Sequence, residues 1–138
     1  MDLLDECLTC LLRTEYKCEI ILSNEGKIIY NTFFNTYPFA RWGQIDWEKV
    51  LHKELLTTLE DIPPCLAKNG KNFSQEVYII WGDINLPIVK CMLENVLQYI
   101  DEITPLGMYS TWFYCPSEKW VIEFYHHGDI TIGFESEK

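Results

Sequence analysis

The sequence predicts an α+β fold, with a largely antiparallel β-sheet packed against about three α-helices. Segments with helical periodicity alternate with short β-type runs, and most neighbouring β-type runs are joined by short turns typical of hairpins. The chain has 138 residues, of which 48% are hydrophobic, which suffices for the core of a single domain spanning residues 1–138. The predicted order of elements is α-β-β-α-β-α-β-β-β.

The N-terminal third is predicted to form a helix followed by a hairpin. Residues 3–12 place Leu and Cys side chains at the spacing of one helical face. Two β-type runs follow at 18–22 and 27–30, and the Asn and Gly of residues 23–26 suit the turn between them. Residues 31–46 show no period of 2 or 3.6 and therefore predict a structured loop.

The middle of the chain is predicted to form a helix, a strand and another helix. Apolar side chains recur at helical spacing over 47–60, between an Asp that can cap the helix and the pair Pro63–Pro64 that would end it. Residues 65–74 should be an exposed loop, and the apolar run 77–81 indicates a central strand. A third helix should begin near Asn85, with a proline in its first turn, and end before Gly107.

The last third is predicted to be three β-strands at 108–115, 120–125 and 130–134. A three-residue loop between the last two strands would place Phe124 opposite Ile132 and Ile122 opposite Phe134, with the apolar side chains on one face. The residues expected in the core share large apolar side chains at inward positions. They are Leu8, Leu11, Ile20, Leu51, Leu55, Ile79, Val89, Leu93, Val96, Leu97, Phe113, Ile122, Phe124 and Ile132.

Net charge and segment hydropathy exclude several classes of partner. Twenty-one acidic against eleven basic residues give a net charge of −10, which repels a phosphate backbone, so no nucleic acid is expected as a ligand. No run approaches the ~18 apolar residues that span a bilayer, so no membrane partner is expected. Residues 1–6 are acidic where a signal peptide would be basic, which predicts a cytoplasmic protein.

The six cysteines are predicted to be free thiols, because disulfides are rare in the cytoplasm. Cys7 and Cys10 form a C-x-x-C, but within a helical pattern, which favours buried structural cysteines over redox or zinc chemistry. We therefore expect no metal and no cofactor.

One enzymatic alternative rests on the segment from Glu123 to Asp129. His126 or His127 could act as a general base beside either carboxylate. Adjacent histidines in a strand point to opposite faces, however, and His52 is the one other histidine in the sequence. Motifs for nucleophiles and for nucleotide binding are absent from the sequence, so a polar hairpin tip is the preferred interpretation.

Acidic charge and surplus aromatic rings predict a protein-binding surface instead. Five Trp, eight Tyr and seven Phe exceed the needs of a small core, and residues 91–138 hold eight carboxylates against two lysines. Such a surface would attract a basic partner. The expected partner-binding residues are Glu118, Glu123, Tyr125 and Asp129, followed by Asp83, Glu94, Asp101 and Glu102.

The run from Trp120 to Phe134 resembles the closing hairpin of immunity proteins paired with bacterial toxins, such as those of contact-dependent growth inhibition systems. The size, the acidity and the lack of a catalytic motif agree with this resemblance. It implies a non-enzymatic, monomeric inhibitor that neutralises a co-encoded toxin in a one-to-one complex. Carboxylates that replace phosphates would suit a nuclease toxin with a basic active site. A small His/carboxylate enzyme and a self-associating scaffold subunit remain the alternatives.

Overall fold

The structure is a computed structural model that describes residues 18–82, 85–107, 110–126 and 128–135. Within these ranges the chain forms an antiparallel sheet with the strand order β1-β4-β3-β5-β6-β7-β2. The strands are β1 (Glu19–Ile20), β2 (His52–Leu56), β3 (Glu76–Trp81), β4 (Val89–Met92), β5 (Ser110–Cys115), β6 (Trp120–Tyr125) and β7 (Ile130–Phe134). The predicted α+β class with an antiparallel sheet is confirmed.

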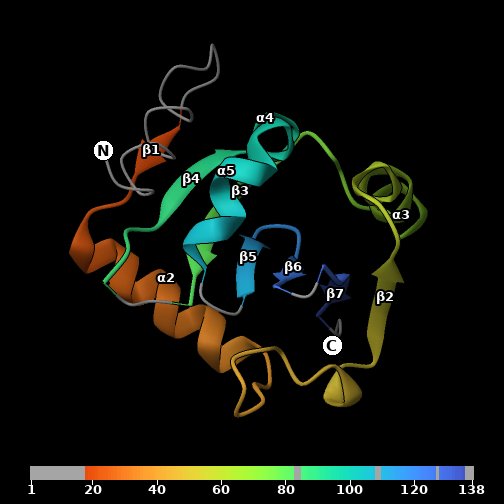
Figure 1. Cartoon of the computed structure of the whole chain (residues 1–138), viewed down its shortest axis with the longest axis horizontal. Helices are drawn as coiled ribbons and strands as arrows, with labels where there is room; N and C mark the ends of the chain where they lie inside the picture. The colour runs from red at the N-terminus through yellow and green to blue at the C-terminus, as the bar shows by residue number, and fades with distance from the viewer. Residues whose placement is uncertain (1–17, 83–84, 108–109, 127, 136–138) are drawn as a thin grey trace.

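Helices cover both faces of this sheet (Figure 1). The α-helices are α2 (Ser23–Thr36), α3 (Ile62–Lys68), α4 (Leu93–Val96) and α5 (Ile100–Ile103). Short 3₁₀ turns are η1 (Trp47–Lys49), η2 (Leu59–Asp61), η3 (Leu97–Tyr99) and η4 (Thr104–Leu106). One core cluster lies between the sheet and α3, α4 and α5, and the second lies between the sheet and α2 with residues 37–50.

Strand β5 is buried at every position. Phe113 and Cys115 belong to the first cluster, whereas Trp112 and Tyr114 belong to the second. Successive side chains of a strand point to opposite faces, so a strand covered on both faces has no exposed side. The predicted central strand over 77–81 is confirmed as β3, between β4 and β5.

The predicted hairpin over 18–30 is wrong, because residues 23–36 form α2. The apolar side chains of residues 29, 30, 33, 34 and 37 recur at helical spacing, and all of them pack in the second cluster. Phe33 is fully buried, with its ring centroid 5.3 Å from that of Trp112 and 5.0 Å from that of Tyr114. Only residues 37–46 of the predicted loop are irregular, and they contain an isolated bridge between Phe39 and Ile45.

The predicted helix over 47–60 is also wrong. This stretch contains η1 and strand β2, and β2 pairs with β7. The two prolines that were expected to end a helix instead begin α3, since proline is tolerated in the first turn, where its missing N–H has no partner to lose. Two expected core residues of this stretch are consequently exposed, Leu51 by 85% and Leu55 by 72%. Ile20 of β1, which was also expected in the core, is 42% exposed.

The third predicted helix begins later than expected. Residues 89–92 form β4, which pairs with both β1 and β3, and helical structure follows only from Leu93 to Leu106. Val89, Leu93 and Val96 are buried as predicted, because the alternating β4 and the helical turns present them to the same cluster. Leu97 is partly buried against that cluster.

The C-terminal strands β6 and β7 have the predicted bounds, but their register is shifted by two residues. Phe124 pairs with Ile130, and Ile122 pairs with Ile132. The connection is tighter than predicted, because the N–H of Gly128 donates to the carbonyl of Tyr125 with Gly128 at φ 97°. A shift of two positions keeps every side chain on its face, so Ile122, Phe124 and Ile132 are buried as predicted.

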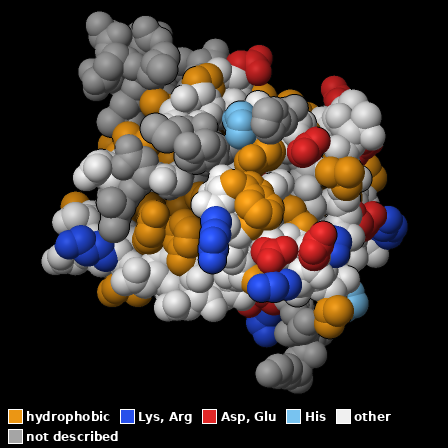
Figure 2. Space-filling view, turned by 60° about the horizontal axis from the view of Figure 1, so that its bottom comes forward, with side chains coloured by type: hydrophobic (Ala, Val, Ile, Leu, Met, Phe, Trp, Pro, Cys, Tyr) orange, Lys and Arg blue, Asp and Glu red, His pale blue; other side chains and the backbone are white. Residues whose placement is uncertain are grey.

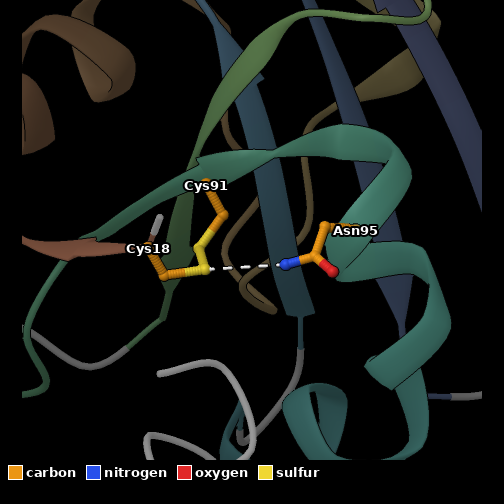
Figure 3. The surroundings of a disulfide bond; sticks show 3 residues. All are labelled: Cys18, Cys91 and Asn95. Carbon is orange, nitrogen blue, oxygen red and sulfur yellow. Dashed lines mark hydrogen bonds between the residues drawn. A yellow bond between two sulfur atoms is a disulfide. The ribbon is translucent and has the colours of Figure 1, made fainter. Parts of the chain in front are cut away.

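Cys18 and Cys91 form a disulfide, which corrects the prediction of six free thiols (Figure 3). The pairing of Glu19 with Lys90 places the two cysteines side by side, with their Cα atoms 4.5 Å apart. Cys65 and Cys115 are free and buried. The expected helix over 3–12, including Cys7 and Cys10, lies outside the described residues, and so do Leu8 and Leu11.

Helices of the described ranges are all too short or too polar to cross a membrane.

Candidate partner-binding groove

A groove of about 410 Å³ lies where β6 turns into β7, facing α5 and η4. Three segments that are remote in sequence contribute to it. They are Leu59 at the start of η2, residues 100–107, and the β6–β7 connection. Its lining consists of Leu59, Ile100, Asp101, Thr104, Pro105, Gly107, Phe124, Tyr125, His126, Gly128, Asp129 and Ile130. The sheet therefore positions this groove, since β6 and β7 fix one wall of it.

Three of the predicted partner-binding residues meet in this groove. Asp101 on α5 and Asp129 before β7 are exposed, and Tyr125 ends β6 with its side chain partly buried. The Tyr125 ring centroid lies 4.5 Å from that of His126 at an interplanar angle of 61°. Two carboxylates beside an edge-to-face pair of aromatic rings can receive a cationic side chain and exclude water around it.

The floor of the groove is apolar. Phe124 and Ile130 are 7% and 8% exposed and pair with each other across β6 and β7. Leu59 and Ile100 are partly buried against the same core cluster. Leu59 was not predicted as a site residue, because the sequence pattern assigned it to a helix over 47–60, where the structure has β2 and η2 instead.

The other surface residues of the prediction lie elsewhere. Glu118 is in the turn between β5 and β6, separated from Tyr125 by the length of β6, roughly 20 Å. Glu94 is exposed on α4 and is not among the residues that line the groove. Asp83 and the side chain of Glu102 lie outside the part of the chain that the structure describes.

Glu123 is buried, with 1% of its surface exposed, which overturns its prediction as a residue in direct contact with a partner. Its carboxylate points to the second core cluster and accepts three hydrogen bonds. The Ile45 N–H donates to Oε2 at 2.8 Å, the Trp112 indole donates to Oε2 at 3.0 Å, and the Trp47 indole donates to Oε1 at 2.8 Å. Glu123 therefore attaches residues 45–47 to the sheet.

Desolvation raises the pKa of the Glu123 carboxyl above its ordinary value, and its three N–H donors oppose that shift. A second carboxyl, Glu135, has its pKa raised by burial while it accepts a hydrogen bond from the Tyr37 hydroxyl at 3.4 Å. Burial and the nearby Glu135 charge also raise the pKa of Tyr37. Both carboxyl groups therefore hold a proton more tightly in the folded chain than in the unfolded one.

Of the residues of the histidine-based alternative, the structure brings His126 and Asp129 to the same groove, whereas Glu123 is buried in the core. His126 lines the groove, His127 is outside the described residues, and His52 lies on the edge strand β2. Across the described ranges, no three His, Cys, Asp or Glu side chains are grouped so that they could hold a metal ion.

Charge is mixed on the face shown in Figure 2, where acidic, basic and hydrophobic side chains are interspersed. The acidic side chains therefore do not form a continuous patch over this face. The large hydrophobic side chains most exposed to solvent are Ile20, Leu22, Ile28, Trp42, Leu51 and Leu55.

No curated protein matches the sequence. The family model of the CdiI immunity protein EcoliA0-like family matches residues 1–133, which is nearly the whole chain. The chain therefore belongs to the CdiI immunity proteins of the EcoliA0-like family, whose role is the neutralisation of a toxin.

Proposed function

We propose that this immunity protein neutralises a nuclease toxin by inserting the carboxylates of its groove into a basic site. The observation that carries the proposal is the convergence of Asp101, Tyr125 and Asp129 on one groove with an apolar floor. A nuclease holds phosphates with Lys and Arg side chains, and a pair of carboxylates offers these cations the same kind of partner.

The proposed mode of action is stoichiometric occlusion, without catalysis. Tyr125 and the floor around Phe124 would exclude water from the contact, which strengthens the ion pairs at its rim. The net charge of −10 would speed the encounter with a basic partner. One monomer of inhibitor would bind one toxin domain, in the cytoplasm, where such a toxin meets its nucleic acid.

The test is binding of the purified chain to the C-terminal domain of the co-encoded toxin, together with nuclease activity of that domain. We expect one molar equivalent of the wild-type chain to abolish nucleic acid cleavage. The double variant Asp101→Lys/Asp129→Lys should bind at least about 100-fold more weakly at low salt, because like charges then face each other. The loss should shrink at high salt.

The matched control is Glu25→Lys/Glu48→Lys, which reverses two exposed carboxylates on α2 and η1 and makes the same change in net charge. Its affinity should fall far less than that of the groove variant. Equal losses in both variants would mean that net charge alone drives binding, and an unchanged groove variant would remove the groove from the interface. A toxin domain with no activity on nucleic acid would reject the nuclease assignment.

A further inference from the structure

Strand β2 forms one edge of the sheet. It pairs with β7 over five residues, and in the part of the chain that the structure describes no strand pairs with its other side. Figure 1 shows β2 at the right-hand end of the sheet, away from α2. An edge strand presents unpaired N–H and C=O groups, on which another extended chain can add.

The side chains of this edge are unusual for a surface. Leu51 is 85% exposed and Leu55 is 72% exposed, with Lys53 between them. Since alternate side chains of a strand share a face, Lys53 and Leu55 lie on one side of the sheet, and Leu51 directly precedes the strand. On that side of the sheet the ring of Trp47 covers β7 at Gly133, the residue that pairs with Lys53. The ring does not cover the two leucines, which are exposed to solvent.

We propose that the edge of β2 binds an extended segment of the cognate toxin as an additional strand of the sheet. This inference rests on the neutralisation of a toxin by this chain, and it adds a second contact to the groove. The added strand would place apolar side chains opposite Leu51 and Leu55, and a carboxylate opposite Lys53. Backbone hydrogen bonds would supply affinity, and the alternating side chains would supply specificity.

Charge favours a toxin strand over a second copy of this chain. A symmetric antiparallel pair of β2 strands that matches Leu51 with Leu55 would place Lys53 directly opposite its own copy. Like charges in directly opposed positions are destabilising, and lysine on an edge is a common protection against self-pairing. A partner strand with an acidic residue at this position removes the repulsion.

The edge is also continuous with the groove. Leu56, the last residue of β2, pairs with Ile130, and the chain then reaches Leu59. Ile130 and Leu59 both line the groove. The end of β2 therefore lies beside the groove, whose floor is on the face of the sheet opposite to Leu55. A toxin strand added along β2 presents alternate side chains to both faces, so one partner could contact both surfaces.

The first experiment measures the affinity of the full chain for the C-terminal domain of the co-encoded toxin. The variant Leu51→Glu/Leu55→Glu should retain the wild-type thermal unfolding midpoint, because both side chains are exposed. We expect its dissociation constant to rise at least about 100-fold. The matched control is Leu22→Glu/Ile28→Glu, which adds the same two charges at positions 75% and 66% exposed, before and on α2, and should bind as the wild type does.

The second measurement is backbone hydrogen exchange of residues 52–56 with and without that toxin domain. We expect amides of this strand to become protected in the complex. Unchanged exchange together with unchanged affinity of the leucine variant would overturn the proposal. If only the groove variant Asp101→Lys/Asp129→Lys loses affinity, the edge contact fails while the proposed function stands. A dimer of the wild type that the leucine variant abolishes would instead assign the edge to self-association.

Discussion

The indole N–H of Trp47 donates a 2.8 Å hydrogen bond to Oε1 of Glu123, a residue 76 positions further along the chain. The other oxygen of this carboxylate accepts from Ile45 and from Trp112. One buried carboxylate thus satisfies three N–H groups that would otherwise lie unpartnered beside the sheet. It also attaches the irregular segment between α2 and β2 to the centre of the molecule.

Glu123→Gln should lower the free energy of unfolding by about 1–3 kcal/mol. An amide has one acceptor oxygen, and its NH₂ group would face an N–H donor where the carboxylate now accepts. At least one of the three donors would lose its partner. Urea denaturation measures the loss, with Glu48→Gln, exposed beside Trp47, as the control. Equal stability of the two variants would contradict the role of this carboxylate.

The stabilising effect of Glu123 should depend on pH. Burial raises its pKa from an ordinary value of 4.5, so above that pH the folded chain binds more protons than the unfolded one. The free energy of unfolding therefore falls as pH rises from about 4.5 toward the raised pKa. The stability difference between wild type and Glu123→Gln should be larger near pH 4.5 than near pH 7. A stability difference between the two proteins that increases with pH would contradict a raised pKa of Glu123.

Gly133→Ala should destabilise the fold by about 1–3 kcal/mol. A Cβ at this position of β7 would lie 2.5 Å from Cζ3 of Trp47, so the ring would have to move and its bond to Glu123 would weaken. Thermal unfolding measures the loss. Gly26→Ala is the control, since a Cβ there meets nothing within 4 Å and lies in helix α2. A neutral Gly133→Ala would mean that the ring repacks without cost.

Phe33→Ala should cost about 3–5 kcal/mol, because this fully buried ring holds α2 against Trp112 and Tyr114 of β5. Ile28→Ala on the same helix should change stability by less than about 0.5 kcal/mol, since Ile28 is 66% exposed. Chemical denaturation of the two variants compares the buried and exposed faces of α2. Similar costs would show that α2 does not pack as described.

Replacing the disulfide by Cys18→Ser/Cys91→Ser should lower stability by about 4 kcal/mol under oxidising conditions. The cysteines are 73 positions apart, and the chain-entropy model assigns a loss of this size to a loop of that length. Wild type and variant should have nearly equal stability once a reductant has opened the bond. A difference that persists in the reduced state would place the effect in packing around Asn95 and β4 (Figure 3).

The sequence by itself determined the α+β class, the central strand β3 and the C-terminal strands β5, β6 and β7. These strands are rich in aromatic and β-branched residues and are bounded by clear turn residues, and both signals are local. The sequence also selected Asp101, Tyr125 and Asp129, which the fold brings to one groove. Their proximity depends on α5 and the β6–β7 connection lining the same groove, which no local pattern encodes.

Only the tertiary structure decided where ambiguous segments belong. The apolar residues 28–30 suit a strand or a helix, and packing of this segment in the second cluster, with Phe33 against Trp112 and Tyr114, selects the helix. The leucines of 51–59 have helical spacing, yet pairing with β7 makes β2 a strand and leaves Leu51 and Leu55 exposed. Pairing of β1 with β4 likewise joins two cysteines that are remote in sequence. In each case the decisive contacts are non-local, and their free energy exceeds the weak local preference of the segment.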